Sequence, residues 1–271
     1  MAETIVSIII EGFGTWKKNL NICLPFVFSS VLTFVAAIIV IGSATLLTDD
    51  PLFVGIHYFT QTAEIPPDII PQLQLQFLLS MGAIIIAVLL GLIINAFFIA
   101  GAIGMAKEAI ERGKTNLSDM ADYGRQKFIS LLFANIIVGL IILAGVAFLI
   151  PGMLSIIPDM TLPKLVMLVY MVLVSIMFVL VPFAVVIGNF GAIEGVKKGF
   201  KLYRTHKLDV FLLGLIVLLI GLVMGLVTGF IPVVGQLINI AVSVFIILPL
   251  TVLWWTKFYM CVTAPRRFGG L

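Results

Sequence analysis

The sequence has few charged residues, few histidines and few cysteines, and each scarcity excludes a class of protein. Only 11% of its 271 residues are charged, whereas about a quarter are charged in a soluble domain. Two cysteines cannot make a disulfide framework. The sequence holds no H-E-x-x-H, Walker or G-x-S-x-G motif. We therefore expect a protein that is not an enzyme and has no cofactor and no metal site.

Apolar residues, in contrast, make up 62% of the chain. They gather in six blocks, each long enough for a membrane-spanning helix, which needs about 20 apolar residues. A β-barrel would show shorter segments of alternating hydrophobicity. The sequence thus predicts an all-α integral membrane protein forming a single polytopic domain, residues 1–271. The predicted spans are 22–46, 74–103, 128–150, 165–188, 210–231 and 237–256.

The basic residues lie almost entirely on one side of these spans. Fifteen of the sixteen Lys and Arg residues fall in the N-terminal segment, the loops 104–127 and 189–209, and the C-terminal tail. The other side carries only Lys164. Because short basic loops stay in the cytoplasm during insertion, we expect a multi-pass protein of the cell membrane with cytoplasmic N- and C-termini. The basic residues form no patch with interleaved aromatic residues, so nucleic acid is not an expected partner.

Amphipathic segments precede the first and fifth spans on the cytoplasmic side. Apolar residues from Ile5 to Trp16, and again from Ile193 to Tyr203, recur at helical spacing opposite charged residues. Such helices lie in the membrane interface, with cations toward anionic headgroups. The alternative is that they extend the spans into water. The residues predicted to contact lipid headgroups are Trp16, Lys17, Lys18, Lys197, Lys201, Tyr203 and Arg204.

A unit of amphipathic segment, span, outer turn and return span occurs three times. The middle amphipathic segment is split at Gly113–Asn116 into 102–112 and 117–127. All three units start from the cytoplasm, which predicts a three-fold parallel hairpin repeat rather than an inverted one. The alternative is that any protein with an even number of spans and basic inner loops resembles a repeat.

Small residues and prolines mark the expected helix contacts. Gly221, Gly225 and Gly229 form a doubled G-x-x-x-G in the fifth span, which lets another helix approach closely. We expect that helix to come from the same chain, with a homo-oligomer as the alternative. Pro182 and Pro249 lie at matching places in spans four and six, where proline removes a backbone hydrogen bond and kinks the helix.

The span interiors hold only small or neutral polar residues. Asn95, Asn135 and Asn239 are the candidates to line a cavity, although hydrogen bonding between helices is the commoner role of such residues. The outer loop 47–73 carries several acids and His57, which leaves a divalent cation site there as an alternative to a plain turn.

Two stretches carry a family resemblance. The first is VPF at 181–183 followed by GAIEGVKKGFKLYR at 191–204, and the second is LPLT at 248–251 in the last span. Together they resemble a six-span prokaryotic family that includes the membrane domain fused to some glycerophosphodiester phosphodiesterases. The resemblance implies a six-span fold. The sequence holds no counterpart of the phosphodiesterase catalytic domain, so no catalytic residue is carried over.

These observations predict a non-enzymatic membrane protein that organises or contacts lipids or partner proteins. The alternative is a transporter, channel or lipid-translocating protein for a neutral or amphiphilic solute. A water-accessible cavity at the bilayer midplane, lined by the asparagines, would favour transport. A packed apolar interior would favour the first function.

Overall fold

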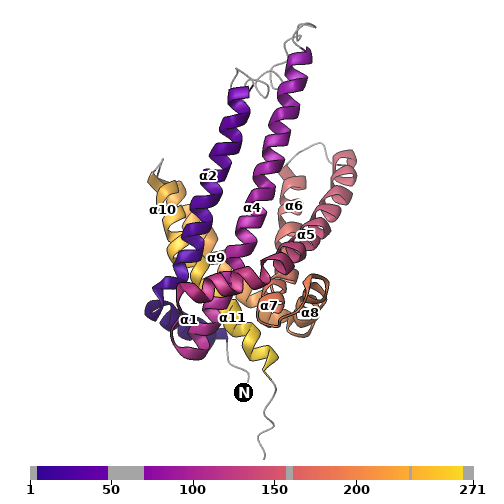
Figure 1. The fold of residues 1–271 in the computed structure, drawn as a ribbon. Coiled ribbons are helices and arrows are strands. Elements are labelled where there is room, and N and C mark those ends of the chain that lie inside the picture. The colour runs from indigo at the N-terminus through magenta and orange to yellow at the C-terminus, as the bar shows by residue number, and fades with distance from the viewer. Residues whose placement is uncertain (1–4, 48–69, 157–160, 232–233, 265–271) are drawn as a thin grey trace, which may run out of the picture. The chain divides into compact units, whose positions relative to one another are not determined.

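The computed structural model describes residues 5–47, 70–156, 161–231 and 234–264, and their regular structure is helical (Figure 1). The predicted all-α class is confirmed. Most of the outer loop, with its candidate cation ligands, lies outside the described residues. The described helices are α1 (Ile5–Lys18), η1 (Leu20–Cys23), α2 (Leu24–Leu47), α4 (Ile70–Arg112), α5 (Leu117–Ile156), α6 (Thr161–Phe178), α7 (Val181–Val186), α8 (Ala192–Thr205), α9 (Lys207–Gly229), α10 (Val234–Val242), η2 (Ser243–Ile247) and α11 (Leu248–Thr263).

Six helical segments within the described ranges are long and apolar enough to cross a membrane, so the six predicted spans are confirmed. Two of them extend well beyond the predicted ends, because α4 and α5 continue into the basic segments around Gly113. The segments are Leu20–Ser43, Leu78–Arg112, Leu117–Phe148, Leu165–Val186, Lys207–Gly229 and Val234–Thr263.

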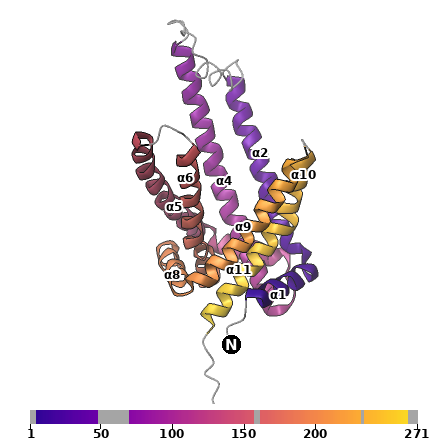
Figure 2. The same cartoon turned by 180° about the vertical axis from the view of Figure 1, so that it is seen from behind.

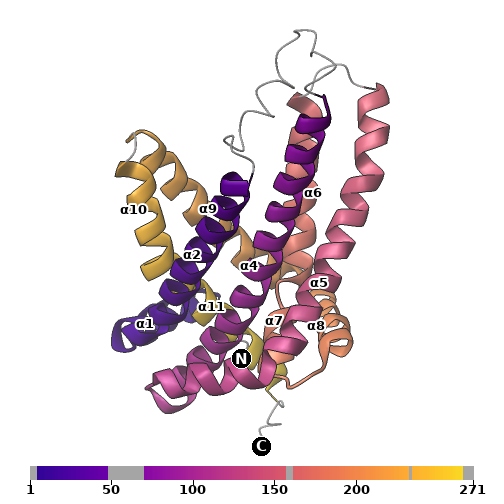
Figure 3. The same cartoon turned by 45° about the horizontal axis from the view of Figure 1, so that its top comes forward.

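The chain forms two compact units. The smaller one, residues 28–95, contains most of α2 and the first part of α4, which run side by side as a hairpin (Figures 1 and 3). Gly91 of α4 faces Thr33 of α2, where an added Cβ would make an ordinary contact of 3.7 Å. The larger unit contains residues 1–27 and 96–271.

The core of the larger unit gathers at one end of the spans, where α7 packs on α8 (Figure 1) and α1 packs on α11 (Figure 2). Fully buried side chains there include Ile22, Ile103, Leu180 and Leu253. Farther along the spans the apolar side chains are exposed, and Phe148 of α5 is 84% exposed. Lipid is as apolar as these side chains, so spanning segments need not hide them.

The structure differs from the prediction only in how the middle amphipathic segment is built. α1 and α8 are separate amphipathic helices of 14 residues each. The middle segment does break at residues 113–116, with Gly113 at φ +76°. Its two halves, however, belong to the long helices α4 and α5, because good helix formers continue the helical hydrogen bonding on both sides of the break.

Both predicted prolines interrupt their spans. The fourth span stops at Phe178 and resumes as α7 at Val181, with Pro182 in its first turn. The sixth span passes through a π-helical stretch, η2, immediately before Pro249. Proline is accommodated there because a helix start or a π-bulge already lacks the hydrogen bond that its ring removes.

Each of the three segments that were predicted to be cytoplasmic packs through a glycine against a return span. The pairs are Gly12 with Trp254, Gly124 with Phe97, and Gly199 with Val181. An aromatic residue follows each glycine by four positions, namely Trp16, Phe128 and Tyr203. The three-fold repeat stays a prediction, and these matched contacts support it.

Candidate functional site

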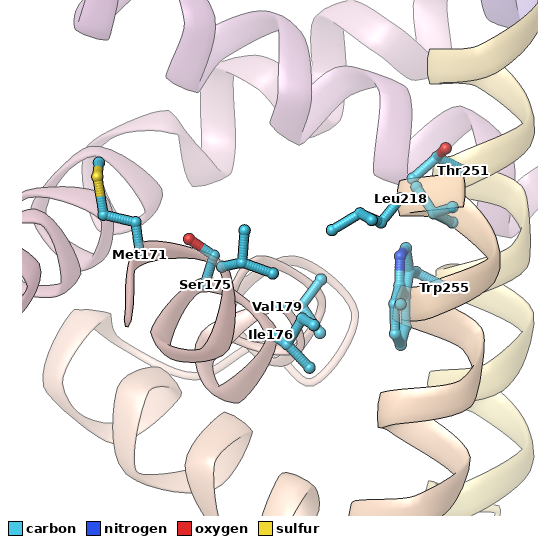
Figure 4. Close-up of a pocket in the computed structure, with 10 residues that line it drawn as sticks. Met171, Ser175, Ile176, Val179, Leu218, Thr251 and Trp255 are labelled. Atoms are coloured by element: carbon cyan, nitrogen blue, oxygen red, sulfur yellow. The ribbon is translucent and has the colours of Figure 1, made fainter. Parts of the chain in front are cut away.

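An open crevice with a volume of about 390 Å³ lies between α6, α9 and α11 of the larger unit (Figure 4). One wall is formed by the end of α6, including Ile176, together with Val179 just after it. Leu218 of α9 and Trp255 of α11 lie across the space from that wall. The volume falls within the range of small-molecule sites in proteins, about 300–1,000 Å³.

The crevice lies beside the two helix interruptions. Val179 lies in the turn that ends α6, and Thr251 follows Pro249 by two residues. Where a helix ends or bends, its ridges of side chains stop fitting the grooves of a neighbour. Gly214 brings α9 close to α6 at this point, because an added Cβ would lie 3.3 Å from Ile176 Cγ1. The prolines thus interrupt the packing while the glycine keeps the helices near each other.

The lining of the crevice is almost entirely apolar and includes no charged residue. Its polar groups are the hydroxyls of Ser175 and Thr251 and the indole nitrogen of Trp255. In Figure 4 the nitrogen of Trp255 lies on the side of Thr251 and Leu218. An apolar pocket with a few placed polar groups is the usual form of a site for a small apolar or amphiphilic ligand.

The predicted topology places the crevice a short way into the membrane from the predicted cytoplasmic face. Gly214 is seven residues beyond Lys207, the first residue of α9, which is about 10 Å at 1.5 Å per residue. Trp255 is eight residues before Thr263, the last residue of α11, or about 12 Å. Since the hydrocarbon core is about 30 Å thick, both residues belong to the predicted inner leaflet.

The three asparagines predicted to line a cavity do not line this crevice. Asn95 is an exposed residue of the smaller unit. Asn135 on α5 and Asn239 on α10 are half-buried. The crevice is therefore not the polar cavity that these residues were predicted to form.

The predicted glycine contact is wrong for the described part of the chain. No described residue lies within 4 Å of the place a Cβ would take on Gly221, Gly225 or Gly229, and all three are exposed. The spacing does place them on one face of α9, but that face meets no other described helix of this chain. A second copy of the chain stays the predicted alternative.

The predicted headgroup residues divide into two groups. Trp16 is half-buried and donates its indole N–H to the Phe245 carbonyl oxygen at 3.2 Å, so it holds α1 to the last span. Tyr203 is also half-buried, beside Phe200. The cations are all exposed, and this group is Lys17, Lys18, Lys197, Lys201 and Arg204.

The attachment of Trp16 has a cause in the backbone. Phe245 precedes Pro249 by four residues, and proline has no N–H to donate to its carbonyl. Cys23 Sγ is a second donor to the same oxygen, at 3.1 Å. The N-terminal segment thus satisfies a carbonyl that the proline leaves free.

Sequence reasoning missed two ionic contacts at this end of the molecule, each with one buried and one exposed partner. Glu108 of α4 is 6% exposed, accepts a hydrogen bond of 2.9 Å from the Tyr123 hydroxyl, and pairs with Arg112 at 2.8 Å. Lys257 of α11 pairs with Glu11 of α1. Their charge and position in the sequence suit a solvated helix end equally well, so no sequence signal distinguished them.

The comparisons with known proteins gave one match. A protein-family model described as "Domain of unknown function (DUF7847)" matches residues 68–262, well over half of the chain and all of the crevice. No curated protein and no solved structure matches the chain.

Proposed function

We propose that this chain, which belongs to the DUF7847 family, is a non-enzymatic protein of the cell membrane that binds a lipid chain between α6, α9 and α11. One observation carries the proposal: an almost wholly apolar crevice of about 390 Å³ lies among membrane-spanning helices. The surrounding medium at that depth is lipid hydrocarbon. A lipid chain is the molecule present there at the highest concentration.

The chemistry of the lining supports a lipid over a polar solute. An ion or a polar solute would lose its hydration in the crevice, and no charged residue lines it to replace that hydration. The lining offers hydrogen bonds from only two hydroxyls and one indole N–H, which is enough only for a ligand that is mostly apolar. For a polar solute, the transporter alternative needs a polar path, which this crevice does not provide.

The exposed cations of α1 and α8 support a second lipid contact, with headgroups. Lys17 and Lys18 end α1, and Lys197 and Lys201 lie on α8. A cation close to an anionic leaflet contributes on the order of 1 kcal/mol. We therefore expect the cytoplasmic ends of the spans to bind anionic headgroups, while the crevice binds a chain of an adjacent lipid.

Self-association through the glycine face of α9 and the similarity to the membrane domain of glycerophosphodiester phosphodiesterases both stay predictions. Neither is needed for lipid binding, because the crevice is built by one copy of the chain.

Filling the crevice tests the proposal. Leu218→Trp places a large side chain in the space, and Leu222→Trp is the matched control, one helical turn along α9 at a position that is 51% exposed and does not line the crevice. The chain is purified from membranes, and the lipid that stays bound is measured by native mass spectrometry. We expect bound lipid in the wild type and the control, and a loss of most of it in Leu218→Trp.

The same lipid content in all three proteins would contradict the proposal. Flux of a polar solute across protein-containing vesicles that Leu218→Trp blocks and Leu222→Trp leaves intact would favour the transporter alternative.

A further inference from the structure

We infer that the crevice selects a glycerolipid over a plain hydrocarbon, because the indole N–H of Trp255 is placed to bind a linkage oxygen of the lipid. This inference rests on the proposed function, since it names the class of ligand for the same site. It is carried by the hydrogen bonding of the three tryptophans, by two hydroxyls of the lining and by the depth of the crevice.

The three tryptophans differ in what their N–H groups meet. Trp16 donates to the Phe245 carbonyl and Trp254 donates to the Ile9 carbonyl, each at 3.2 Å. Trp255 is 2% exposed and packs edge-to-face on Phe258. Among the described residues none accepts a hydrogen bond from it, and its ring lines the crevice. Its N–H is not among the fully buried unpaired side-chain atoms of the described residues, so it is open to the crevice, and the geometry points to an acceptor supplied by the occupant.

The two hydroxyls of the lining are also without a helical partner. Several Thr residues elsewhere in the described helices donate back to a carbonyl one turn earlier, among them Thr228 to Met224 and Thr263 to Tyr259. Within the described structure no such bond forms at Ser175 or Thr251. The two residues line the crevice from different helices, Ser175 from α6 and Thr251 from α11. They can therefore bind polar atoms of an occupant, as the indole N–H can.

The depth of this polar group matches the linkage region of a lipid. Trp255 lies about 12 Å along α11 from its cytoplasmic end. The headgroup region on each side of a bilayer is about 5–8 Å thick, so Trp255 lies just inside the boundary with the hydrocarbon. Linkage oxygens of a glycerolipid lie at that boundary, and its chains extend from there toward the midplane.

The polar contact matters for selection because the ligand must be taken up from bulk lipid, which is itself apolar. A chain that moves from bilayer to crevice leaves one apolar environment for another, so no hydrophobic free energy is gained. Selection must then come from packing and from hydrogen bonds that the bilayer interior does not offer. A hydrocarbon of the same length would leave the N–H of Trp255 unpaired.

The test is a competition between two probes. Dioleoylglycerol and a linear C18 alkene, at equal concentration, are incubated with the delipidated full-length protein, and retained ligand is measured by gas chromatography and mass spectrometry. Trp255→Phe keeps an aromatic ring and removes the N–H. Trp254→Phe is the control, since its N–H is already bonded to Ile9 outside the crevice.

We expect the wild type and Trp254→Phe to prefer dioleoylglycerol, and Trp255→Phe to lose roughly 2- to 12-fold of that preference, as expected for one hydrogen bond. An unchanged preference in Trp255→Phe, or an equal loss in Trp254→Phe, would overturn the inference. Should Trp255→Phe fail to fold, Thr251→Val removes a neighbouring lining hydroxyl at nearly constant shape, and an unchanged preference in that variant would overturn it. Retention of neither probe by the wild type would instead contradict the proposed function.

Discussion

Two helix glycines that look alike in the sequence differ in the fold, since one is buried and the other is exposed. This difference predicts opposite effects on stability for Gly199→Leu and Gly225→Leu. Gly199 of α8 is buried against α7, where an added Cβ would lie 2.8 Å from the backbone N and Cα of Val181. Gly225 of α9 is exposed, and no described residue lies within 4 Å of its Cβ position. Both glycines are in helix interiors, so each variant serves as the control for the other.

The magnitude follows from two opposing terms. A contact of 2.8 Å to backbone atoms cannot be relieved by a side-chain rotation, so α8 must move away from α7, and overpacking of this kind costs about 1–3 kcal/mol. A four-carbon side chain belongs at the upper end of that range. Leucine regains roughly 0.8 kcal/mol over glycine through helix propensity. We expect Gly199→Leu to be destabilised by about 1–2 kcal/mol and Gly225→Leu to be stabilised by up to about 1 kcal/mol.

Thermal unfolding in one detergent, followed by tryptophan fluorescence, measures the difference. A gap of about 1–3 kcal/mol between the variants corresponds to roughly 2–12 °C in Tm at 2–4 °C per kcal/mol. Equal melting temperatures, or a lower one for Gly225→Leu, would refute the packing described for these glycines. An unchanged Tm with a smaller particle on size-exclusion chromatography would assign Gly225 to an interface with a second copy.

Two further predictions concern topology and the N-terminal helix. Lys114→Cys is expected to react only with reagent applied from the cytoplasmic side and Thr62→Cys only with reagent from outside, because basic segments stay inside; reversed labelling would invert the topology. Trp16→Phe is expected to lower the free energy of unfolding by about 1 kcal/mol, because the Phe245 carbonyl loses its stronger donor; an unchanged melting temperature would show that this hydrogen bond does not stabilise the fold.

Local sequence signals predicted the spans, the break near Gly113 and the interruptions at Pro182 and Pro249. Each depends on properties of a few neighbouring residues, such as hydropathy over about 20 positions or a missing N–H. The extension of α4 and α5 into the basic segments around Gly113 was not predicted, because charged residues that suit an interfacial helix suit the exposed end of a long helix equally well.

The contacts of the glycines could not be predicted for a different reason. Spacing by four shows that Gly221, Gly225 and Gly229 share one face of their helix. It does not show which other helix, if any, packs against that face. Gly191, Gly195 and Gly199 have the same spacing, and there Gly195 and Gly199 do lie against a return span, as does Gly12, which belongs to no such series. Their neighbours are set by the chain's path in space.

The crevice could not be predicted from the sequence because three helices that are distant in sequence form it. Ile176, Leu218 and Trp255 look in isolation like ordinary residues of apolar spans, and only their arrangement leaves a space between them. The asparagines were chosen because a cavity was expected to be wet. The structure instead has an apolar space, in which a tryptophan N–H supplies part of the polarity.

A structure of the protein at high resolution in a bilayer of its native lipids tests lipid binding most directly. We expect elongated non-protein density between Ile176 and Trp255, with its polar end within hydrogen-bonding distance of the indole nitrogen of Trp255. A crevice that holds ordered water, or that is closed by the lining side chains with no such density, would contradict it.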